Sequence, residues 1–357
     1  MGINLGAQVR SLVVCGRVWA LKNEGNMSFE SAYRNALQGL SPADNQMRLI
    51  AKVARMYHER GIRQGEIAER LHISQPRVSR LLKKAADVGI VRTTVVLPPG
   101  IFTDLEELLE RKFGLRQAVV VDVEGDEREI ISGLASAAAE YLRATLIGRD
   151  TVGVSSWSAS LLATVDSLGP FKNQVVDSVV QLVGGLGDPK VEVLAAHLIT
   201  ALARDTGADA VFLPAPGVLA STEAHEALMN DPAVGQVKDV WRRLTLALLG
   251  IGAVEPSDLL KQSGNVLTDV ELKHLEDAGA VGDVCQRFFD PEGSPIDTDF
   301  NARVVGISRE ELMKVPRRVG VAGGERKYRA IRGAILGEWV NVLITDTHTA
   351  RRLLEER

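Results

Sequence analysis

Aromatic residues are scarce in this sequence, at 4% of its 357 residues. Proteins that bind single-stranded nucleic acid commonly stack bases on aromatic rings, so this composition argues against that class of protein. Cysteine is rarer still, since Cys15 and Cys285 are the two cysteines of the chain, and they lie far apart. Such usage is typical of a reducing compartment, and it offers neither a disulfide framework nor a zinc-binding spacing.

Long apolar runs are also missing. No stretch of the sequence reaches the ~18 uninterrupted apolar residues of a membrane helix. The apolar segment SLVVCGRVWAL contains Arg17 and is followed by no clear cleavage site, so it does not have the form of a signal peptide. We therefore expect a cytoplasmic protein without a membrane partner. Residues 1–42 are interpreted as an N-terminal extension, either disordered or, because Met27 could also begin the protein, outside the native chain.

Motifs for nucleotide and metal chemistry are absent from the sequence. Neither the GxxxxGK[ST] phosphate loop nor the GxGxxG dinucleotide fingerprint occurs. The six histidines show no zinc-ligand spacing; they are His58, His72, His197, His225, His274 and His348. No paired set of carboxylates stands out as a general acid and base. We therefore expect no metal site, no cofactor and no catalytic residues.

Positive charge is concentrated in one segment. Between Arg48 and Arg92 there are eleven lysines and arginines and four acidic residues, a net charge of +7. The whole chain carries −4, so the remainder carries about −11. A solvated helical face is the ordinary explanation of such a run. The alternative is a small cationic module that binds a polyanion, attached to an acidic body that polyanions repel.

The apolar spacing of this segment predicts three short helices. The first runs from Asp44 to a glycine stop at Gly61, and the second carries Ile67, Ala68 and Leu71 on one face. The third begins after the tight connection His72-Ile73. Any packed three-helix module can show this pattern, but two helices joined by a tight turn, with a basic outer face, favour a DNA-binding helix-turn-helix.

The third helix is the candidate recognition helix. Ser74 is expected to be its N-cap and Pro76 to lie in its first turn, where a missing N–H costs little. Polar and basic side chains are left on its outer surface and beyond it. The residues expected at base or groove edges are Gln75, Arg77, Ser79 and Arg80, and those expected at phosphates are Lys83, Lys84 and Arg92. Ser74 is also expected to belong to the DNA-binding set. Residues 85–94 are expected to end the helix and begin the strand of a wing.

From about residue 100 the sequence alternates between strand-like and helical segments. Many of the strand-like segments are continuously apolar, as in a parallel sheet that is covered on both faces. The expected strands are 118–123, 151–155, 175–184, 210–216, 244–252, 302–308, 318–324 and 341–346. Because ligands of such sheets bind outside the carboxyl ends of the strands, those ends are the places to search for a site.

Several strand ends carry residues suited to a ligand. Ser155, Ser156 and Ser158 open a helix and could bind a phosphate or a polyol, or could simply cap that helix. Gly184 and Gly185 end or follow the 175–184 strand, and Gly323 and Gly324 with Lys327 end or follow the 318–324 strand. A further candidate is Asp283, which is flanked by apolar residues in GAVGDVCQRFFDPEG and could hold sugar hydroxyls. The glycines could equally serve turns, Lys327 could be an exposed helix lysine, and Asp283 could cap a turn.

The segment GEIAERLHISQPRVSRLLKKAADVGIVRTTV resembles the DNA-binding part of the SorC/DeoR family of sugar-responsive bacterial transcription regulators. The resemblance continues through VGVSSWSASL, VVQLVGGLG, FLPAPGVLAS, GAVGDVCQRFFDPEG and VAGGERKYRAI. It implies that the serines, the Gly184 loop, Asp283 and Lys327 surround one effector pocket, in a domain that is similar to sugar-phosphate isomerases. It also implies a homodimer or homotetramer. Family members often carry glycine-threonine where this chain has Ser158-Ala159-Ser160, which leaves the identity of the effector open.

The sequence thus predicts an α/β protein with a (winged) helix-turn-helix domain, 43–98, and a doubly wound, mainly parallel α/β effector and oligomerisation domain, 99–357. The predicted function is a transcription regulator whose partners are double-stranded operator DNA and a sugar, polyol or sugar phosphate. The alternative is a sugar-phosphate isomerase or deaminase with an accessory DNA-binding module.

Overall fold

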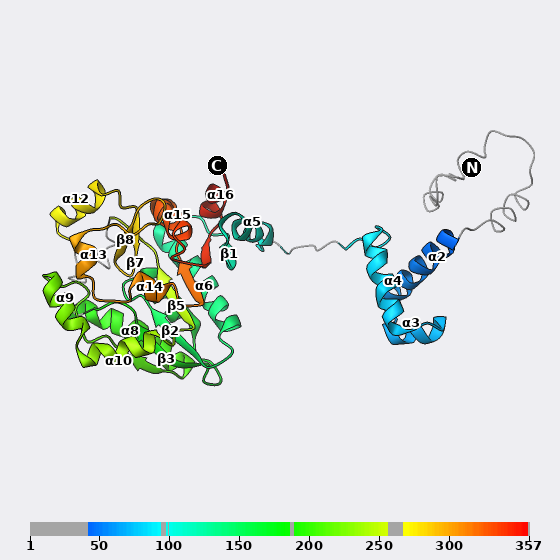
Figure 1. Ribbon diagram of the computed structural model, residues 1–357, viewed down its shortest axis with the longest axis horizontal. Helices are drawn as coiled ribbons and strands as arrows, with labels where there is room; N and C mark the ends of the chain where they lie inside the picture. Colours follow the sequence, from blue (N-terminus) through cyan, green and yellow to red (C-terminus); the bar gives the residue numbers. More distant parts are fainter. Residues whose placement is uncertain (1–41, 94–97, 99, 186–188, 256–266, 356–357) are drawn as a thin grey trace, which may run out of the picture. The chain divides into compact units, whose positions relative to one another are not determined.

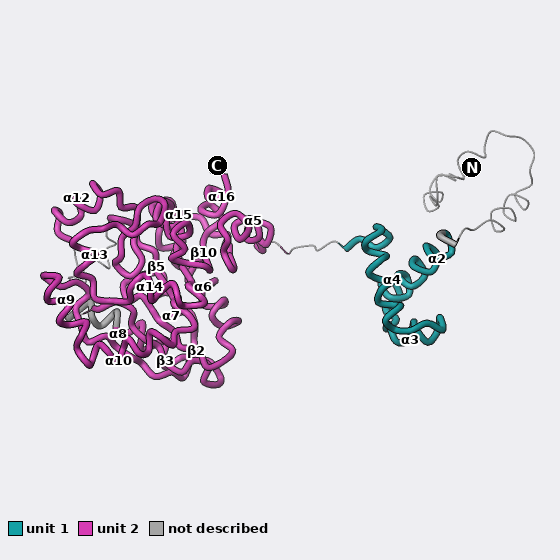
Figure 2. Tube along the Cα trace, in the orientation of Figure 1, with its two compact units in different colours: residues 1–96 teal, residues 97–357 magenta. Residues whose placement is uncertain are grey.

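The computed structural model describes residues 42–93, 98, 100–185, 189–255 and 267–355. The chain forms two compact units, residues 1–96 and residues 97–357, which are coloured separately in Figure 2. Each unit has a hydrophobic core of its own, so each is described by itself.

The first unit consists of helices packed around a small core (Figure 1). Its elements are α2 (Pro42–Ala54), the π-helical turn η2 (Arg55–Glu59), α3 (Gln64–Leu71) and α4 (Gln75–Asp87). Apolar side chains from all four elements are buried together; they include Ile50, Val53, Met56, Ile67, Ala68, Val78, Leu81 and Ala85. The three- and four-residue spacing of these positions is therefore the pattern that folds the unit.

A tight turn joins α3 to α4. His72 adopts the left-handed conformation, with φ of 52°, and ends α3. The Ile73 N–H donates to the Ala68 carbonyl at 3.0 Å and holds the turn against α3. Ser74 occupies the N-cap position of α4 as expected, but its side chain makes no capping hydrogen bond. Pro76 lies in the first turn of α4.

The expected wing strand is wrong over the residues that the structure describes. Helix α4 continues to Asp87, residues 88–91 form turns and bends, and residues 92–93 have no regular structure, whereas Thr94 lies outside the described residues. The local cause is a helix-ending turn: Gly89 has φ of +76°, and the Val91 N–H donates back to the Ala85 carbonyl at 3.0 Å. The chain up to Val91 therefore turns back toward the end of α4.

The second unit is built on one seven-stranded sheet. Its strands are β1 (Gln117–Val121), β2 (Asp150–Val154), β3 (Val176–Gln181), β4 (Asp209–Val211), β5 (Leu246–Gly250), β9 (Arg317–Val321) and β10 (Val342–Asp346). Their order across the sheet is β1-β10-β9-β5-β2-β3-β4, and every neighbouring pair is parallel. The predicted mainly parallel α/β fold is confirmed.

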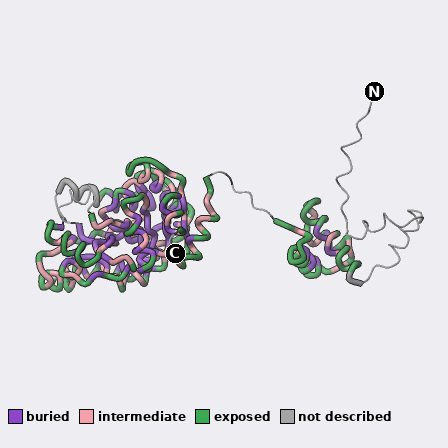
Figure 3. The backbone as a smooth tube through the Cα atoms, turned by 90° about the horizontal axis from the view of Figure 1, so that it is seen from above, coloured by how far each residue is buried: buried purple, intermediate pink, exposed green. Residues whose placement is uncertain are grey.

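Helices cover both faces of this sheet (Figure 1). One face packs against α6 (Glu127–Thr145), α7 (Ala159–Leu168) and α8 (Pro189–Thr206). The other packs against α5 (Thr103–Phe113), α10 (Pro232–Trp241), α15 (Tyr328–Leu336) and α16 (Thr347–Glu355). In β5, Leu246 and Leu248 enter the first core while Ala247 and Leu249 enter the second. Both faces are buried, which is why this strand is apolar without alternation. Buried residues are concentrated in the interior of the unit (Figure 3).

A second, antiparallel sheet was not predicted. It consists of β6 (Gly252–Ala253), β7 (Gly282–Val284) and β8 (Arg287–Phe289). The expected strand 302–308 is wrong, because Thr298 caps the short helix α13 (Asp299–Arg303), and the residues after it make isolated bridges at Val304 and Gly306.

The remaining elements are α9 (Thr222–Met229), α12 (Asp269–Asp277), α14 (Arg309–Leu312) and the 3₁₀ turn η3 (Glu325–Lys327). Among the helices that the structure describes, none has the length and apolar character needed to cross a membrane.

Candidate functional site

A cleft lies where the winding of the sheet reverses. From β2 the chain continues to β3 and β4 on one side, then returns to β5 on the other side of β2 and continues outward to β9 and β10. The carboxyl ends of β2 and β5 therefore form a topological switch point, the usual ligand site of an open α/β sheet. The free volume of the cleft is about 70 Å³.

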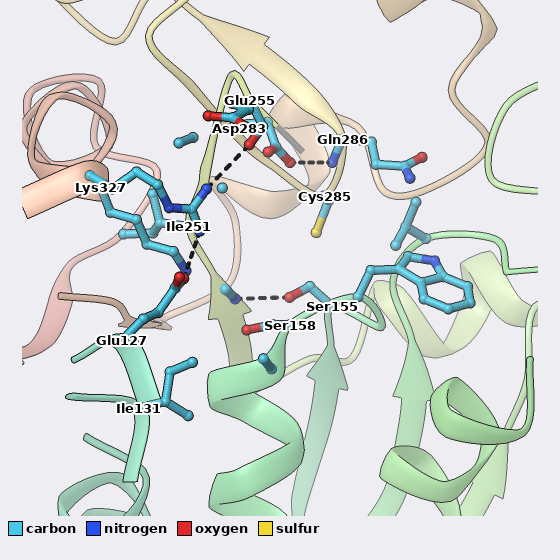
Figure 4. Close-up of a pocket in the computed structure, with 17 residues that line it drawn as sticks. Glu127, Ile131, Ser155, Ser158, Ile251, Glu255, Asp283, Cys285, Gln286 and Lys327 are labelled. Atoms are coloured by element: carbon cyan, nitrogen blue, oxygen red, sulfur yellow. Dashed lines mark hydrogen bonds and ion pairs between the residues drawn. The ribbon is translucent and has the colours of Figure 1, made fainter. Parts of the chain in front are cut away.

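Two of the predicted serines line the cleft at the end of β2. The Ser155 hydroxyl accepts from the Gly250 N–H at 2.9 Å, which ties the ends of β2 and β5 together (Figure 4). Ser158 caps α7, with its hydroxyl 3.4 Å from the Leu161 N–H. A Cβ at Gly250 would lie 2.6 Å from the Ser158 hydroxyl, so glycine is needed there. Ser156 does not line the cleft, and its hydroxyl donates to the Val183 carbonyl at 3.5 Å.

Asp283 lies on β7 and lines the same cleft. Its carboxylate accepts from the Gln286 N–H at 2.9 Å. Burial raises the pKa of Asp283 to about 6, although the Gln286 N–H and the Lys327 ammonium act in the opposite direction. A carboxyl group with this pKa can change its protonation state near neutral pH, and in either state it can bind a ligand hydroxyl.

Cationic side chains from η3, Arg326 and Lys327, also line the cleft. Lys327 is half-buried, and its pKa is lowered by burial and by the neighbouring Arg326 guanidinium. Arg326 donates to Glu127 Oε1 at 2.7 Å and to the Glu255 carbonyl at 3.4 Å, so it joins α6 to the segment after β6 (Figure 4). An ammonium and a guanidinium beside one cleft can bind an anionic ligand group.

The predicted glycines have different places. Gly323 and Gly324 line an adjoining hollow that shares Lys327 and Arg326 with the cleft. The Gly324 N–H donates to Asp346 Oδ2 at 2.8 Å, and this buried carboxylate holds the diglycine loop at the end of β9.

Gly184 and Gly185 do not line the cleft. A Cβ on Gly184 would lie 2.3 Å from the Pro216 carbonyl oxygen, and a Cβ on Gly185 would lie 3.1 Å from the Trp157 ring. The structure therefore gives both glycines a packing role, which is neither the ligand role nor the turn role that the sequence suggested.

The sequence did not identify several residues that line the cleft. They include Glu127, Trp157, Ile251, Cys285, Gln286 and Arg326. Ile251, Trp157 and Arg326 directly follow or flank strand ends that the sequence located, so position alone could have suggested them. Glu127 comes from the start of α6, and no local pattern connects it with the strand ends that form the cleft.

Replacing Asp283 by asparagine is expected to stabilise the protein above pH 6. The pKa of this group is raised on folding from 3.8 to about 6, so ionisation destabilises the folded state above pH 6 and not below pH 4. The asparagine side chain would keep an acceptor for the Gln286 N–H without the buried charge. We expect the free energy of unfolding at pH 7.5 to rise by about 1–3 kcal/mol, with the gain disappearing near pH 4.

Urea denaturation of both proteins between pH 4 and 8 measures this gain. The matched control is Asp277→Asn, at an exposed position of α12, which should give a difference that does not follow this pH profile. A pH-independent difference for Asp283→Asn would contradict the assignment of a buried carboxylate.

The first unit presents a basic surface. All predicted DNA-contacting residues are exposed; they are Ser74, Gln75, Arg77, Ser79, Arg80, Lys83, Lys84 and Arg92. Val78, Leu81 and Ala85 are the buried residues of α4, so the basic residues occupy its outer faces. A shallow groove beside α4 is also lined by Asn45 and Gln46 of α2, which the sequence did not identify. The tip of an exposed, basic helix of this kind fits the major groove of DNA.

The chain is similar to known transcription regulators. Residues 100–355 match the family model described as "Putative sugar-binding domain". The deoxyribonucleoside regulator of Bacillus subtilis is 35% identical over 309 residues, which cover 86% of this chain and 97% of that protein. The sorbitol operon regulator of Klebsiella pneumoniae is 29% identical over 318 residues, which cover 87% of this chain and 98% of that protein.

The fold is also found among solved structures. The full-length sorbitol operon regulator SorC of Klebsiella pneumoniae has a TM-score of 0.65 and 28% identity, and the alignment covers 87% of this chain and all of that one. The similarity spans the first unit as well as the second unit. The family model covers most of the second unit. The chain belongs to the SorC/DeoR family of sugar-binding transcriptional regulators.

Proposed function

We propose that this regulator binds a phosphorylated sugar or polyol in the switch-point cleft. The observation that carries the proposal is the grouping of Ser155, Ser158, Asp283 and Lys327 around one cleft (Figure 4). Hydroxyl and carboxylate groups bind the hydroxyls of a sugar, while the ammonium and Arg326 bind an anionic group. Gly323 and Gly324 border this anionic end through the hollow that adjoins it.

The head, 43–98, binds operator DNA through α4. Gln75, Arg77, Ser79 and Arg80 lie on the N-terminal half of α4, the part of a recognition helix that contacts base edges, with Ser74 just before it. Lys83, Lys84 and Arg92 follow and suit phosphates, which fix the position of the head without reading sequence.

Effector control requires that the ligand binds two arrangements of the protein with different affinities. The effector domain, 99–357, would also form a homodimer or homotetramer and so present two heads to a pseudo-palindromic operator. Because the coupling is reciprocal, operator DNA must change the affinity for the effector by the same factor as the effector changes the affinity for DNA. This reciprocity holds whether the regulator is a repressor or an activator.

A second function is favoured by one observation. Asp283 and Lys327 are partly buried, and their pKa values shift toward each other, which is common among acid–base pairs of enzymes. An isomerase or deaminase acting on a sugar phosphate would use such a pair. The same burial raises the pKa of the Cys285 thiol to about 12, so this cysteine does not supply a nucleophile. Turnover of a sugar phosphate by the purified protein would establish the enzymatic function; none is expected.

Thermal-shift measurements with sugars, polyols and their phosphates test the proposal. We expect a phosphorylated compound to raise the Tm, and the same compound to change operator affinity in a fluorescence anisotropy titration. If compounds bind but leave the DNA affinity unchanged, the cleft is a ligand site without a regulatory role. If Asp283→Asn and Lys327→Met leave the binding of that compound intact, the cleft is not the site.

Replacing Glu127 by glutamine is expected to tighten the binding of an anionic effector by about three- to fivefold. Glu127 occupies Arg326 at 2.7 Å, so it competes with an anionic ligand group for the same guanidinium. The pair is largely exposed, which limits the effect to the range of surface ion pairs. Isothermal titration measures the change.

The control for Glu127 is Glu124→Gln, which removes a negative charge from an exposed position nearby. An equal gain from both variants would show that net charge, and not release of Arg326, is responsible.

A further inference from the structure

The turn between β7 and β8 has an unusual backbone. Val284 pairs with Arg287, so Cys285 and Gln286 are the two residues of a hairpin turn. Both have positive φ, 53° and 60°. Two-residue turns of this type normally contain asparagine, aspartate or glycine, because a larger side chain is strained in the left-handed region. A glutamine at this position therefore needs an explanation other than the stability of the hairpin.

The side chain of Gln286 adds a second cost. The residue is 5% exposed, and neither its Oε1 nor its Nε2 has a hydrogen-bond partner in the part of the chain that the structure describes. A buried amide without partners loses its hydration and gains nothing in return. Glycine would remove both the strain and the unpaired amide, so the free protein gives no physical reason for glutamine.

The location of Gln286 suggests a reason. It lines the switch-point cleft, and its N–H donates to the Asp283 carboxylate at 2.9 Å, which fixes its backbone beside that group. Figure 4 shows Gln286 and Lys327 on opposite sides of Asp283. A ligand whose anionic group lies at Lys327 and whose hydroxyls reach Asp283 extends toward Gln286.

We propose that Gln286 is a specificity-determining residue, whose amide binds vicinal hydroxyls at the end of the effector remote from its anionic group. The amide offers an acceptor and two donors, and a pair of neighbouring hydroxyls can donate to Oε1 and accept from Nε2. The side chain has three rotatable torsions, through which the amide can turn onto a bound ligand. This inference rests on the proposed function of the cleft as a sugar-phosphate site.

The test compares ligands that differ by one hydroxyl. The probes are ribose 5-phosphate with 2-deoxyribose 5-phosphate, and glucose 6-phosphate with 2-deoxyglucose 6-phosphate, titrated into the full chain by calorimetry. We expect the parent protein to favour the hydroxylated member of the pair that it binds by about tenfold, the contribution of one buried hydrogen bond. Gln286→Leu keeps the size of the side chain but removes its hydrogen bonds, and should reduce this preference to about one- or twofold.

The stability of the free protein gives a second measurement. Gln286→Gly is expected to raise the Tm without ligand by about 2–6 °C, because it removes the strain and the unpaired amide. The matched control is Gln236→Leu, at an exposed position of α10, which should change neither the ligand preference nor, by more than about 1 °C, the Tm.

The outcomes separate this inference from the function on which it rests. If the parent protein binds one pair and Gln286→Leu keeps the full preference for the hydroxylated member, the role of Gln286 is overturned while the function of the cleft stands. A fall in the Tm of Gln286→Gly would also overturn it, since glutamine would then be explained by stability. If no phosphorylated sugar or polyol of the thermal-shift screen binds the parent protein, the proposed function fails, and the inference fails with it.

Discussion

Replacing Arg77 and Arg80 together by alanine is expected to lower operator affinity by about 100-fold or more. Both side chains are exposed on the N-terminal half of α4, where a recognition helix reaches base edges. An arginine bound to a base edge contributes about 1–3 kcal/mol of discrimination, and two such losses add when the contacts are independent. The core residues Val78 and Leu81 are unchanged, so the head should remain folded.

Anisotropy titrations with operator and with unrelated DNA, at a stated salt concentration, measure this loss. The affinity for operator should fall far more than the affinity for unrelated DNA. Arg55→Ala is the control, because Arg55 is an exposed arginine of the same head whose guanidinium pairs with Glu59 on η2. Equal losses from Arg55→Ala and the double variant would contradict the assignment of α4 as the reading helix.

Replacing Lys327 by methionine is expected to weaken the binding of a phosphorylated effector by about 100-fold. Lys327 is half-buried and lines the cleft, where an ion pair with a ligand anion is less screened than on the surface. Methionine fills a similar volume without the charge. Effector control of DNA binding should be lost at effector concentrations that saturate the parent protein, while operator affinity without effector remains unchanged.

Titration calorimetry and operator binding with and without effector measure the two effects of Lys327→Met. The control is Lys314→Met, at an exposed position beyond α14. If Lys327→Met binds the phosphorylated compound as tightly as the parent protein, Lys327 does not hold the anion. If instead operator affinity without effector falls, the variant acts on the head and not on the ligand.

Local patterns were sufficient to predict the elements that carry much of the function. The spacing of Ile67, Val78 and Leu81 predicted helices α3 and α4 of the head, because helix formation and helix packing depend on residues three and four apart. Continuous apolar runs located the seven parallel strands, because both faces of that sheet are buried. Local patterns failed where long-range or capping contacts decide. The 302–308 run became the end of a Thr298-capped helix, and the residues after Asp87 turned at Gly89.

Some residues of the cleft could be predicted from the sequence, and others only from the tertiary structure. Ser155, Ser158 and Lys327 could be selected from the sequence because each is close to a predicted strand end, and Asp283 because its carboxylate is flanked by apolar residues. Only the tertiary structure decided that Gly184 and Gly185 serve packing, and that Glu127, Arg326 and Gln286 belong to the cleft. Strand order, which local sequence does not encode, places the end of β2 beside the end of β5 and makes a switch point there. The sequence by itself determined a basic reading head and a parallel sheet with ligand chemistry at its strand ends; the tertiary structure decided which of those ends meet.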